Sequence, residues 1–251
     1  MSKTLLKGLT LLEVLARSEK PSGVTELSEE LQLTKSNVHR LLQGLVRQGF
    51  ARNVSDSGQY ELTMKLWELG SYVFGRLDVR QISMPYMEVL AAETSETVHL
   101  SALDGVDALY LAKIDSPQPV RAYTNVGVRA PAHCVATGKA QLAWANSVTI
   151  DTVKQKLEAH TSKSITQAEQ LDQELARVRT QGYALNHGEW REQVCGVAAP
   201  IRDASGRVVA SIGISGPAER LKLRIMQSMA PTVIEACSTI SSLLGYRPHQ
   251  P

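Results

Sequence analysis

Apolar residues recur with helical spacing three times within the first fifty positions. The first stripe predicts a helix over about residues 4–17, and a shorter helix follows from Thr25, its expected N-cap, to about Leu31. The third stretch, "TKSNVHRLLQGLVRQG", starts at Thr34 as a second expected N-cap. Its apolar residues lie at i, i+3, i+4, i+7 and i+8: Val38, Leu41, Leu42, Leu45 and Val46. Two helices in close succession around a tight turn are typical of a helix-turn-helix motif.

After Gly49 the pattern changes from helical to strand-like. "FARNV" and "QYEL" flank the turn-forming cluster "SDSG" and predict a small hairpin, so a winged version of the motif is expected. A further helix is predicted over residues 63–77. Its apolar side is formed by Leu66, Trp67, Leu69 and Val73. We expect this helix to link a first domain, residues 1–62, to a second domain, residues 78–251, and to be a dimer contact, although burial of its apolar side against its own domain explains the pattern equally well.

The second domain mixes strands and helices without regular alternation. A helix is expected from Ser83, its candidate cap, followed by strands "TVHLSAL" and "ALYLAKI" around "DGVD" and by a third strand, "PVRAYTNVG". A capping box of Thr166 and Glu169 predicts the start of another helix, which Gly182 ends. The strand "YALNH", a hairpin of "VCGVAAPIRD" and "RVVASIGIS", and a helix over about residues 224–244 complete the chain. We therefore predict an α+β fold around an antiparallel sheet.

Composition limits the cellular setting and the class of protein. The 251 residues, 43% of them hydrophobic and 21% charged, are compatible with two ordinary globular domains. No apolar run approaches the roughly 18 residues of a membrane span, and the charged N-terminal stretch does not fit a signal peptide. Cys134, Cys195 and Cys237 lie far apart, which favours a reducing compartment over a disulfide framework or a structural zinc site. We expect a cytoplasmic protein without membrane contact.

Charge alone neither requires nor excludes a nucleic-acid partner. The net charge is +2, and residues 1–76 hold ten Lys/Arg and eight Asp/Glu. A DNA-binding hypothesis therefore depends on where the charged and polar side chains lie.

The polar face of the third helix supplies such a position. Its first two turns carry Lys35, Ser36, Asn37, His39 and Arg40. Asn and Arg can form bidentate hydrogen bonds with adenine and guanine edges in the major groove, while Thr34 and Ser36 can donate to phosphates. Arg52, on the first strand of the hairpin, is expected near the phosphate backbone. An ordinary solvated face is the alternative, and the surrounding motif favours DNA.

Three blocks in this order resemble the IclR family of bacterial transcriptional regulators. They are "KSNVHRLLQGLVRQGF", "VGVRAPAHCVATGKAQLA" and "VCGVAAPIRDASGRVVASIGISGP", and the resemblance covers essentially the whole chain. It implies a winged helix-turn-helix domain, a linker helix and an effector-binding domain similar to GAF or PAS sensors. It also implies operator binding as a homodimer or homotetramer, modulated by a small carboxylate or aromatic metabolite.

The effector pocket is predicted partly from residues and mainly from this resemblance. The small residues of "APAHCVATGKA" enter a helix whose start could hold an anion, although the residues alone favour simple tight packing. By resemblance, the backbone of Ala136 and Thr137 grips a ligand carboxylate, and the other wall comes from "NHGEWREQVCG" and "IGISG". The predicted effector contacts are His133, Cys134, Ala136, Thr137, Asn186, Cys195, Gly196, Gly213 and Ser215.

The chain departs from the family pattern at three of these positions. Well-studied members carry an acidic residue, a cysteine and a serine where this chain has Asn186, Gly196 and Gly213. Smaller or neutral side chains predict a roomier and less polar pocket, hence a bulkier ligand such as an aromatic carboxylate, unless Trp190 or Tyr123 refills the space. A small keto acid or sugar acid is the alternative effector.

Other functions are weaker hypotheses. Cys195, His187 and Glu189 could form a nucleophile, a base and an orienting group, but no nucleophile-elbow sequence surrounds Cys195, so we do not expect an enzyme. A metal-dependent sensor would use His133, Cys134, His187 and Cys195, yet no close ligand pair such as HxxxH is present. We therefore predict no metal and no cofactor. A sensor that has lost DNA binding conflicts with the intact polar face at 35–40. The hypothesis is a ligand-responsive regulator of a catabolic operon that binds double-stranded operator DNA as a repressor or activator.

Overall fold

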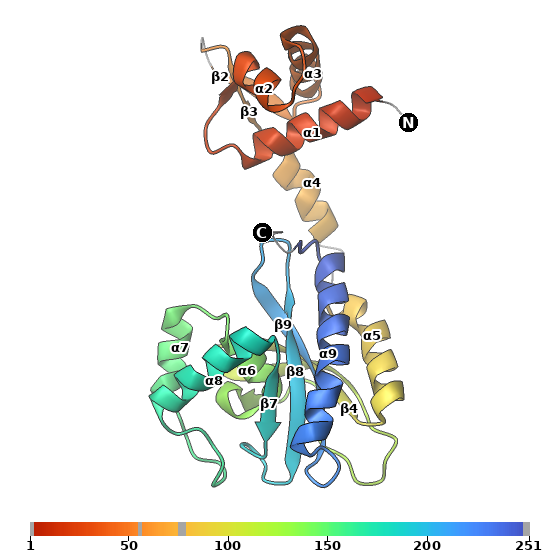
Figure 1. The fold of residues 1–251 in the computed structure, drawn as a ribbon, viewed down its shortest axis with the longest axis vertical. Helices are drawn as coiled ribbons and strands as arrows, with labels where there is room; N and C mark the ends of the chain where they lie inside the picture. The colour runs from red at the N-terminus through yellow and green to blue at the C-terminus, as the bar shows by residue number, and fades with distance from the viewer. Residues whose placement is uncertain (1–2, 55–56, 75–78, 248–251) are drawn as a thin grey trace. The chain divides into compact units, whose positions relative to one another are not determined.

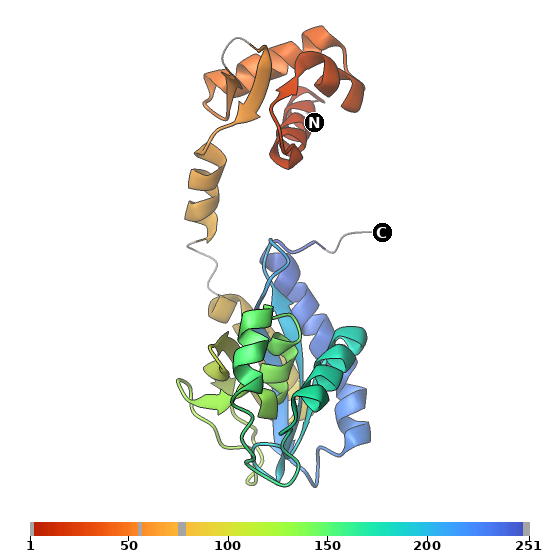
Figure 2. The ribbon, with the colours of Figure 1, turned by 90° about the vertical axis from the view of Figure 1, so that its left-hand side faces the viewer.

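The chain forms two compact units, residues 1–76 and 77–251. The computed structural model describes residues 3–54, 57–74 and 79–247, and the side chains of residues 70–74 are outside the description. The elements are drawn in Figure 1 and, turned by 90°, in Figure 2. Those of the first unit are α1 (Lys3–Arg17), β1 (Ser22–Gly23), α2 (Val24–Glu30), α3 (Lys35–Arg47), β2 (Ala51–Val54), β3 (Gln59–Leu62) and α4 (Lys65–Phe74).

The first unit has the predicted helix order around its own small core. Leu11, Leu27 and Leu42, one from each of the first three helices, are fully buried together. Thr34 caps α3 as predicted, because its Oγ1 accepts a hydrogen bond from the Asn37 N–H at 3.4 Å. The predicted cap Thr25 is wrong. Helix α2 begins at Val24, and the Gly23 N–H donates to Glu26 Oε2 at 3.4 Å.

The predicted hairpin is present and belongs to a three-stranded sheet. Strands β2 and β3 pair antiparallel, and the two-residue strand β1, too short to show in the sequence pattern, adds to β3. Ser55 and Asp56 of the predicted turn lie outside the described residues, as does the side chain of Val73 on α4. A helix-turn-helix followed by this hairpin makes the unit a winged helix-turn-helix domain.

The second unit is built on one six-stranded sheet in which every neighbouring pair is antiparallel. The strand order is β6-β5-β4-β9-β8-β7. The strands are β4 (Thr97–Asp104), β5 (Asp107–Ile114), β6 (Arg129–Pro131), β7 (Ala184–His187), β8 (Val194–Arg202) and β9 (Val208–Pro217). The helices are α5 (Val79–Thr94), the 3-10 turn η1 (Ala132–Cys134), α6 (Ala136–Leu142), α7 (Ser147–Lys154), α8 (Ala168–Gln181) and α9 (Leu223–Leu243). The antiparallel α+β architecture is the predicted one.

Helices cover both faces of this sheet. Helices α5 and α9 lie on one face, and α6, α7 and α8 lie on the other (Figures 1 and 2). Side chains alternate along each strand, so Val197 and Ile201 of β8 enter the core with α9, whereas Ala198 enters the core with α6. Among the described helices, none is both long and apolar enough to cross a membrane.

Three local predictions in this unit are wrong. Ser83 does not cap a helix, because α5 begins at least four residues earlier and encloses both Ser83 and Pro85. Thr166 does not form a capping box, since α8 starts at Ala168 with Gln167 at the N-cap. Gly182 ends α8 as predicted, in the left-handed conformation with φ 82°.

The third error concerns the predicted strand over residues 119–127, which is irregular backbone in the structure. Its carbonyl groups accept hydrogen bonds from side chains instead of pairing along a ladder. Lys113 Nζ donates to the Thr124 carbonyl at 2.8 Å, and Arg220 Nη2 donates to the Val120 carbonyl at 2.8 Å. This segment closes one side of the cavity described below.

Candidate functional site

Two sites follow from the residues singled out in the sequence, one in each unit. The first is the polar face of α3. Val38, Leu41 and Leu42 are buried, while Lys35, Ser36, His39 and Arg40 are exposed, so the helix presents its polar side to solvent. Arg40 Nη2 donates to Asn37 Oδ1 at 3.4 Å, which holds these two side chains together one turn apart. The first turn of α3 carries no acidic residue.

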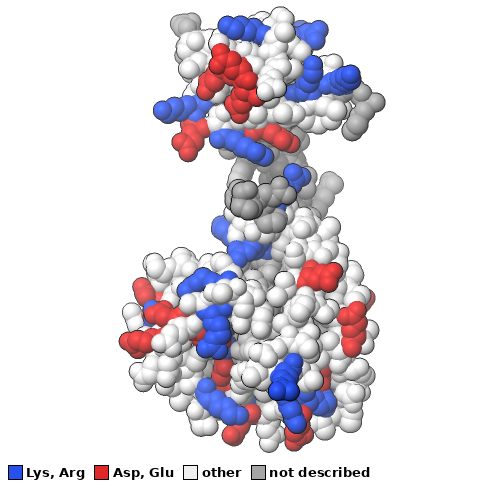
Figure 3. Space-filling model, viewed as in Figure 1, with Lys and Arg blue, Asp and Glu red and all other residues white. Residues whose placement is uncertain are grey.

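The wing places Arg52 at the surface, with its charge partly neutralised. Its guanidinium lies 2.6 Å from Glu61 Oε1 on the neighbouring strand, and its side chain is 70% exposed. Such surface pairs contribute little, so a phosphate can replace Glu61 as the partner. In the view of Figure 3, Lys and Arg on the first unit are interspersed with Asp and Glu, which agrees with its small net charge.

The second site is a cavity of about 40 Å³ between the sheet and the start of α6. Strands β4, β5, β7, β8 and β9, the irregular segment 122–124 and the first residues of α6 all contribute to its wall. Among the predicted contacts, Ala136, Thr137, Asn186, Gly196, Gly213 and Ser215 line it. The volume corresponds to a few water molecules.

His99 of β4 lines the cavity, and both of its ring nitrogens lie within hydrogen-bond distance of hydroxyl groups. Its Nε2 lies 2.7 Å from Ser215 Oγ on β9, and its Nδ1 lies 3.2 Å from Thr124 Oγ1. Burial lowers the pKa of His99 to about 4, with a further contribution from the charge of Lys113. The imidazole is therefore neutral at pH 7 and can donate at one nitrogen and accept at the other.

Thr137 places a hydroxyl in the cavity whose hydrogen-bonding capacity is not used. Its Oγ1 is buried and has no hydrogen-bond partner of good geometry, although the Tyr110 side chain is close. Burial raises the pKa of Tyr110 to about 12, so this phenol is protonated and can also donate. An unpaired buried hydroxyl costs about 1–3 kcal/mol, and a bound ligand or water would remove that cost.

A buried polar network fixes α6 against the sheet directly beneath Thr137. Gln141 Nε2 donates to Ser211 Oγ at 2.9 Å and to the Thr137 carbonyl at 3.0 Å. Ser211 Oγ also donates to that carbonyl at 2.9 Å, and Gln141 reaches Ser101 Oγ at 3.1 Å. The start of α6 is therefore held in place by side chains from β4 and β9.

Lys139, two residues after Thr137 on α6, fixes the turn after β7, which carries another part of the cavity wall. Its ammonium is 1% exposed and lies 2.7 Å from Glu189 Oε2 and 3.1 Å from Glu174 Oε1. Asn186 Oδ1 accepts hydrogen bonds from the N–H groups of Gly188 and Glu189 at 3.1 and 3.0 Å. The Asn186 carboxamide thus shapes the turn after β7 while it also lines the cavity.

Positive charge enters the cavity from Arg191. Its Nη1 donates to the Tyr123 carbonyl at 3.1 Å, and its guanidinium lies 4.6 Å from the centre of the Trp190 ring. Among the described residues that line the cavity, Arg191 is the only one with a charge at pH 7, because His99 is neutral. The cavity therefore favours a ligand with a single negative charge.

The predicted enlargement at Gly196 and Gly213 is not present. A Cβ on Gly213 would lie 2.7 Å from Thr137 Cγ2 and 2.9 Å from Ala198 Cβ, and one on Gly196 would lie 2.6 Å from the Ile214 carbonyl oxygen. The neighbouring strand β9 fills the space at Gly196, and α6 and β8 fill the space at Gly213. Tyr123 and Trp190 also line the cavity, as the alternative reading of the sequence allowed.

His133, Cys134 and Cys195 do not line the cavity. Cys195 precedes Gly196 on β8, so its side chain points to the opposite face of the sheet and packs in the core with α9. His133 and Cys134 lie in η1 beside residue His160. In the described part of the chain, His133 and Cys134 are therefore grouped with His160 and not with His187 and Cys195.

The nucleophile set considered from the sequence is also poorly arranged. Cys195 and His187 are register partners on β8 and β7, but burial raises the pKa of the Cys195 thiol, which keeps it protonated at neutral pH. Glu189 is engaged with Lys139. These three residues therefore lack the activated thiolate of a nucleophilic enzyme.

Comparison with known families decides what the chain is. The family model described as "Bacterial transcriptional regulator IclR C-terminal" matches residues 71–242, and the "IclR helix-turn-helix domain" matches residues 4–55. The chain belongs to the IclR family. It is a DNA-binding transcriptional regulator and not an enzyme.

Individual IclR-family relatives agree with this assignment over the full length. The HTH-type transcriptional regulator KdgR of Escherichia coli K12 is 36% identical over 248 residues, covering 97% of this chain and 93% of the relative. The crystal structure of Thermotoga maritima IclR is 28% identical, with a TM-score of 0.65 over 97% of this chain and 99% of that one. The crystal structure of the C-terminal domain of E. coli KdgR is 31% identical, with a TM-score of 0.61, and covers 68% of this chain and 100% of that one.

Sequence reasoning about this IclR-family chain missed several residues of the cavity. His99, Tyr110, Thr124 and Arg191 come from two strands, an irregular segment and a loop. A usable signal existed for His99 alone, because a histidine within the apolar strand "TVHLSAL" alternates with Val98 and Leu100 and must face the other side of the sheet. Whether Tyr110, Thr124 and Arg191 reach the cavity depends on how the chain returns over the sheet, which the sequence pattern does not show.

Proposed function

We propose that this IclR-family regulator binds operator DNA through α3 and changes its operator affinity when a small hydroxylated or keto monocarboxylate occupies the cavity. The observation that carries the effector part is one cavity that combines an unpaired Thr137 hydroxyl, a neutral His99 and a single cation, Arg191. Coupling between an effector and DNA of about 1–3 kcal/mol is common for such systems.

The polar groups indicate the chemistry of the ligand. Arg191 matches one carboxylate, since a second carboxylate would find no second cation among the described residues of the wall. Neutral His99, Ser215, Thr124 and Tyr110 provide both donors and acceptors, which suit hydroxyl or keto oxygens. Apolar contact comes from Ala122, Val135 and Ile214. These groups favour a sugar acid or a small keto acid over the aromatic carboxylate expected from sequence, because hydroxyl and keto oxygens give hydrogen-bond partners to the wall that an aromatic ring does not.

The effector proposal is tested with the purified full-length protein. A thermal-shift screen compares sugar acids, small keto acids and aromatic carboxylates, because a ligand that binds the folded state raises the unfolding midpoint. We expect shifts with hydroxylated or keto acids, and an affinity for that ligand at least tenfold weaker, about 1.4 kcal/mol, in Arg191→Gln. Arg207→Gln, which removes an exposed guanidinium elsewhere in the unit, is the matched control. A response to aromatic acids alone would contradict the proposed ligand class.

The DNA part rests on the exposed polar face of α3. Thr34, Lys35, Ser36, Asn37, His39 and Arg40 are the proposed contacts, with Arg52 on the wing toward a phosphate. Asn37 and Arg40 already form a pair at the surface, so their polar ends are presented together to a base edge. Such bidentate contacts contribute about 1–3 kcal/mol of discrimination each.

Alanine variants of Arg40 and Asn37, with Arg17 as the matched arginine control, test this assignment. A DNA fragment selected by the wild-type protein from a random pool serves as the probe in a gel-shift titration. We expect Arg40→Ala and Asn37→Ala to lose at least about tenfold in affinity for that fragment. Arg17→Ala, an exposed arginine at the end of α1, should bind like the wild type. A loss in Arg17→Ala as large as that in Arg40→Ala would indicate a general charge effect and refute base reading by α3.

Association of copies is proposed from exposed apolar side chains on the first unit. Trp67 of α4 is 73% exposed, and Met64 just before α4 is 74% exposed. Exposed apolar groups of this size are typical of contact surfaces, which supports a homodimer or homotetramer through this region. Light scattering of Trp67→Ser against the wild type tests it, and an unchanged oligomer mass would refute a role for this helix.

A further inference from the structure

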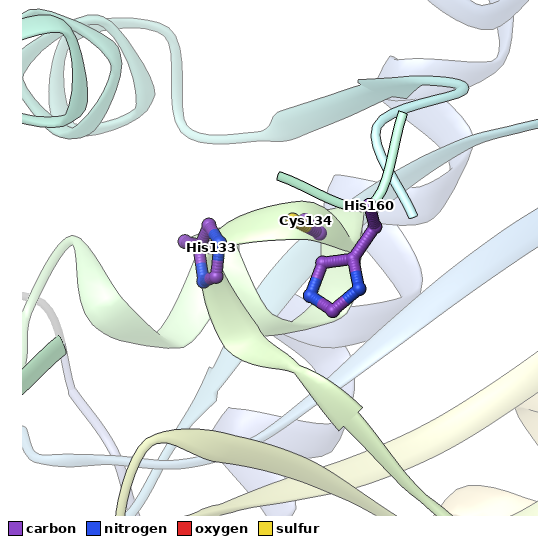
Figure 4. Close-up of side chains that lie close together, drawn as sticks. All are labelled: His133, Cys134 and His160. Carbon is purple, nitrogen blue, oxygen red and sulfur yellow. The ribbon is translucent and has the colours of Figure 1, made fainter. Parts of the chain in front are cut away.

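A histidine–cysteine–histidine cluster lies outside the effector cavity and has no role in the proposed function. His133 and Cys134 are consecutive residues of η1, and His160 comes from the loop between α7 and α8. One ligand atom from each of the three side chains lies within 4.8 Å of the others. Figure 4 shows the three side chains brought together from these two segments.

We propose that His133, Cys134 and His160 bind one transition metal ion of the zinc class and thereby fasten the loop 155–167 to the start of α6. Imidazole nitrogen and thiolate sulfur are the ligands that Zn²⁺ and Co²⁺ prefer in proteins. Three protein ligands leave a fourth tetrahedral position for water or a carboxylate.

The geometry requires only a small closure. Zn–N and Zn–S distances of about 2.0 and 2.3 Å place tetrahedral ligand atoms roughly 3.3–3.8 Å apart. The three side chains must therefore approach by about 1 Å from their present spacing. His160 is exposed, whereas His133 and Cys134 are buried, so the loop that carries His160 is the part that can move inward.

The imidazole that η1 would contribute is weakly engaged within the protein. His133 Nε2 lies 3.4 Å from the Glu158 carbonyl oxygen, near the limit of a hydrogen bond. Burial lowers the pKa of His133, which keeps the ring neutral as a metal ligand requires. Burial raises the pKa of the Cys134 thiol to about 12, so binding as thiolate releases one proton to solvent.

The cluster has an access route and nearby negative charge. A cleft of about 140 Å³ reaches His133 and His160 and is also lined by Asp107, Glu158 and Lys156. Asp107 also lies 4.0 Å from the Arg129 guanidinium, so Glu158 is the carboxylate of the cleft that is nearer to being available for a cation. Either carboxylate is of the right type for the fourth position.

The loop carrying His160 also contacts the turn after β7. Thr161 Oγ1 donates to the Gly188 carbonyl at 2.8 Å, and Ser164 Oγ donates to the Glu189 carbonyl at 2.6 Å. A metal at the cluster would add a bond between this loop and η1. The expected consequence is a more stable second unit in the presence of the ion.

Cobalt titration of the tag-free, chelator-treated full-length protein tests the site. We expect one Co²⁺ per chain, with the visible bands of a tetrahedral ion and a thiolate-to-cobalt charge-transfer band, both removed by added Zn²⁺. His160→Ala should weaken Co²⁺ binding by at least about tenfold, since even loss of an outer hydrogen-bond partner of a metal ligand costs about 10–100-fold. His39→Ala, an exposed histidine in the other unit, is the matched control.

Further variants identify which cysteine supplies the sulfur ligand and control for misfolding of the variants. Cys134→Ser should lose the charge-transfer band while Cys195→Ser retains it, and the exposed position of His160 keeps that variant folded. Zn²⁺ should raise the thermal midpoint of the wild type and of His39→Ala but not of His160→Ala. The proposal is overturned by absence of a thiolate band, by a band that survives in His160→Ala, or by its loss in Cys195→Ser instead of Cys134→Ser.

Discussion

Replacing Lys139 with methionine tests how strongly the buried ion pairs hold the cavity wall. Lys139→Met keeps the length of the stem but leaves two carboxylates without the ammonium. The side chains of Glu189 and Glu174 are only 9% and 12% exposed, at 2.7 and 3.1 Å from Nζ. Removing one partner of a buried pair costs about 3–5 kcal/mol. Glu174 retains Arg177 at 3.3 Å, so we expect a loss near the lower end, about 3 kcal/mol.

Urea unfolding of the full-length protein, followed by tryptophan fluorescence, measures this loss. Lys154→Met is the matched control, because its pair with Asp172 at 2.8 Å is far more exposed, and it should change the free energy of unfolding much less. The double variant Lys139→Met/Glu189→Gln should recover part of the stability, since it removes a buried charge left without a partner. A loss in Lys139→Met no larger than in Lys154→Met would refute the reasoning.

Three further outcomes are expected. The pKa of His99 falls from 6.5 to about 4 on folding, so the free energy of unfolding should decline by up to about 3 kcal/mol as pH falls from 6.5 toward 4 and should receive the full contribution of the neutral ring above pH 6.5. Urea unfolding of His99→Gln should show a shallower decline in that window. An unchanged slope of unfolding free energy against pH would contradict this expectation. Gly213→Ser should lower stability by about 1–3 kcal/mol because its Cβ would lie 2.7 Å from Thr137 Cγ2, and it should abolish the ligand-induced thermal shift; a variant as stable and responsive as the wild type would show that the site can expand. Lys35→Ala should reduce the salt dependence of operator binding by about one counterion, measured by gel shift at several salt concentrations, whereas an unchanged slope would place Lys35 away from phosphates.

Most elements of the fold follow from periodicity because their buried faces are regular. The helix 35–47 and the hairpin of β8 and β9 have strong repeating patterns, and the structure confirms both. Caps were less predictable. Thr25 and Thr166 are of a residue type that commonly caps helices, yet Gly23 and Gln167 stand at the N-caps of α2 and α8. Ser83 suggested a helix start, yet α5 encloses both Ser83 and Pro85, although an interior proline removes one hydrogen bond of the helix and its ring clashes with the preceding turn.

The candidate cavity was predictable only where family resemblance reached. Ala136, Thr137, Gly213 and Ser215 line it as that resemblance implied. Strand alternation alone should have separated Cys195 from Gly196, since adjacent strand residues face opposite sides. The partners of His133 were beyond sequence reasoning, because His160 lies in a loop without periodicity and reaches the cluster only through the tertiary fold.

The irregular segment over residues 119–127 has a consequence for how ligand preference can change. Apart from the backbone bond of the Gly127 N–H to the Tyr110 carbonyl at 2.8 Å, it is held by single side-chain donors from separate places. Thr97 donates to the Ala122 carbonyl at 3.4 Å, and Arg191 donates to the Tyr123 carbonyl at 3.1 Å. No sheet ladder passes through its described backbone. Substitutions at Tyr123 or Thr124 therefore alter the wall of the cavity without shifting strand register. Mutation and selection can retune what the regulator senses at this segment while the folding of the sheet stays the same.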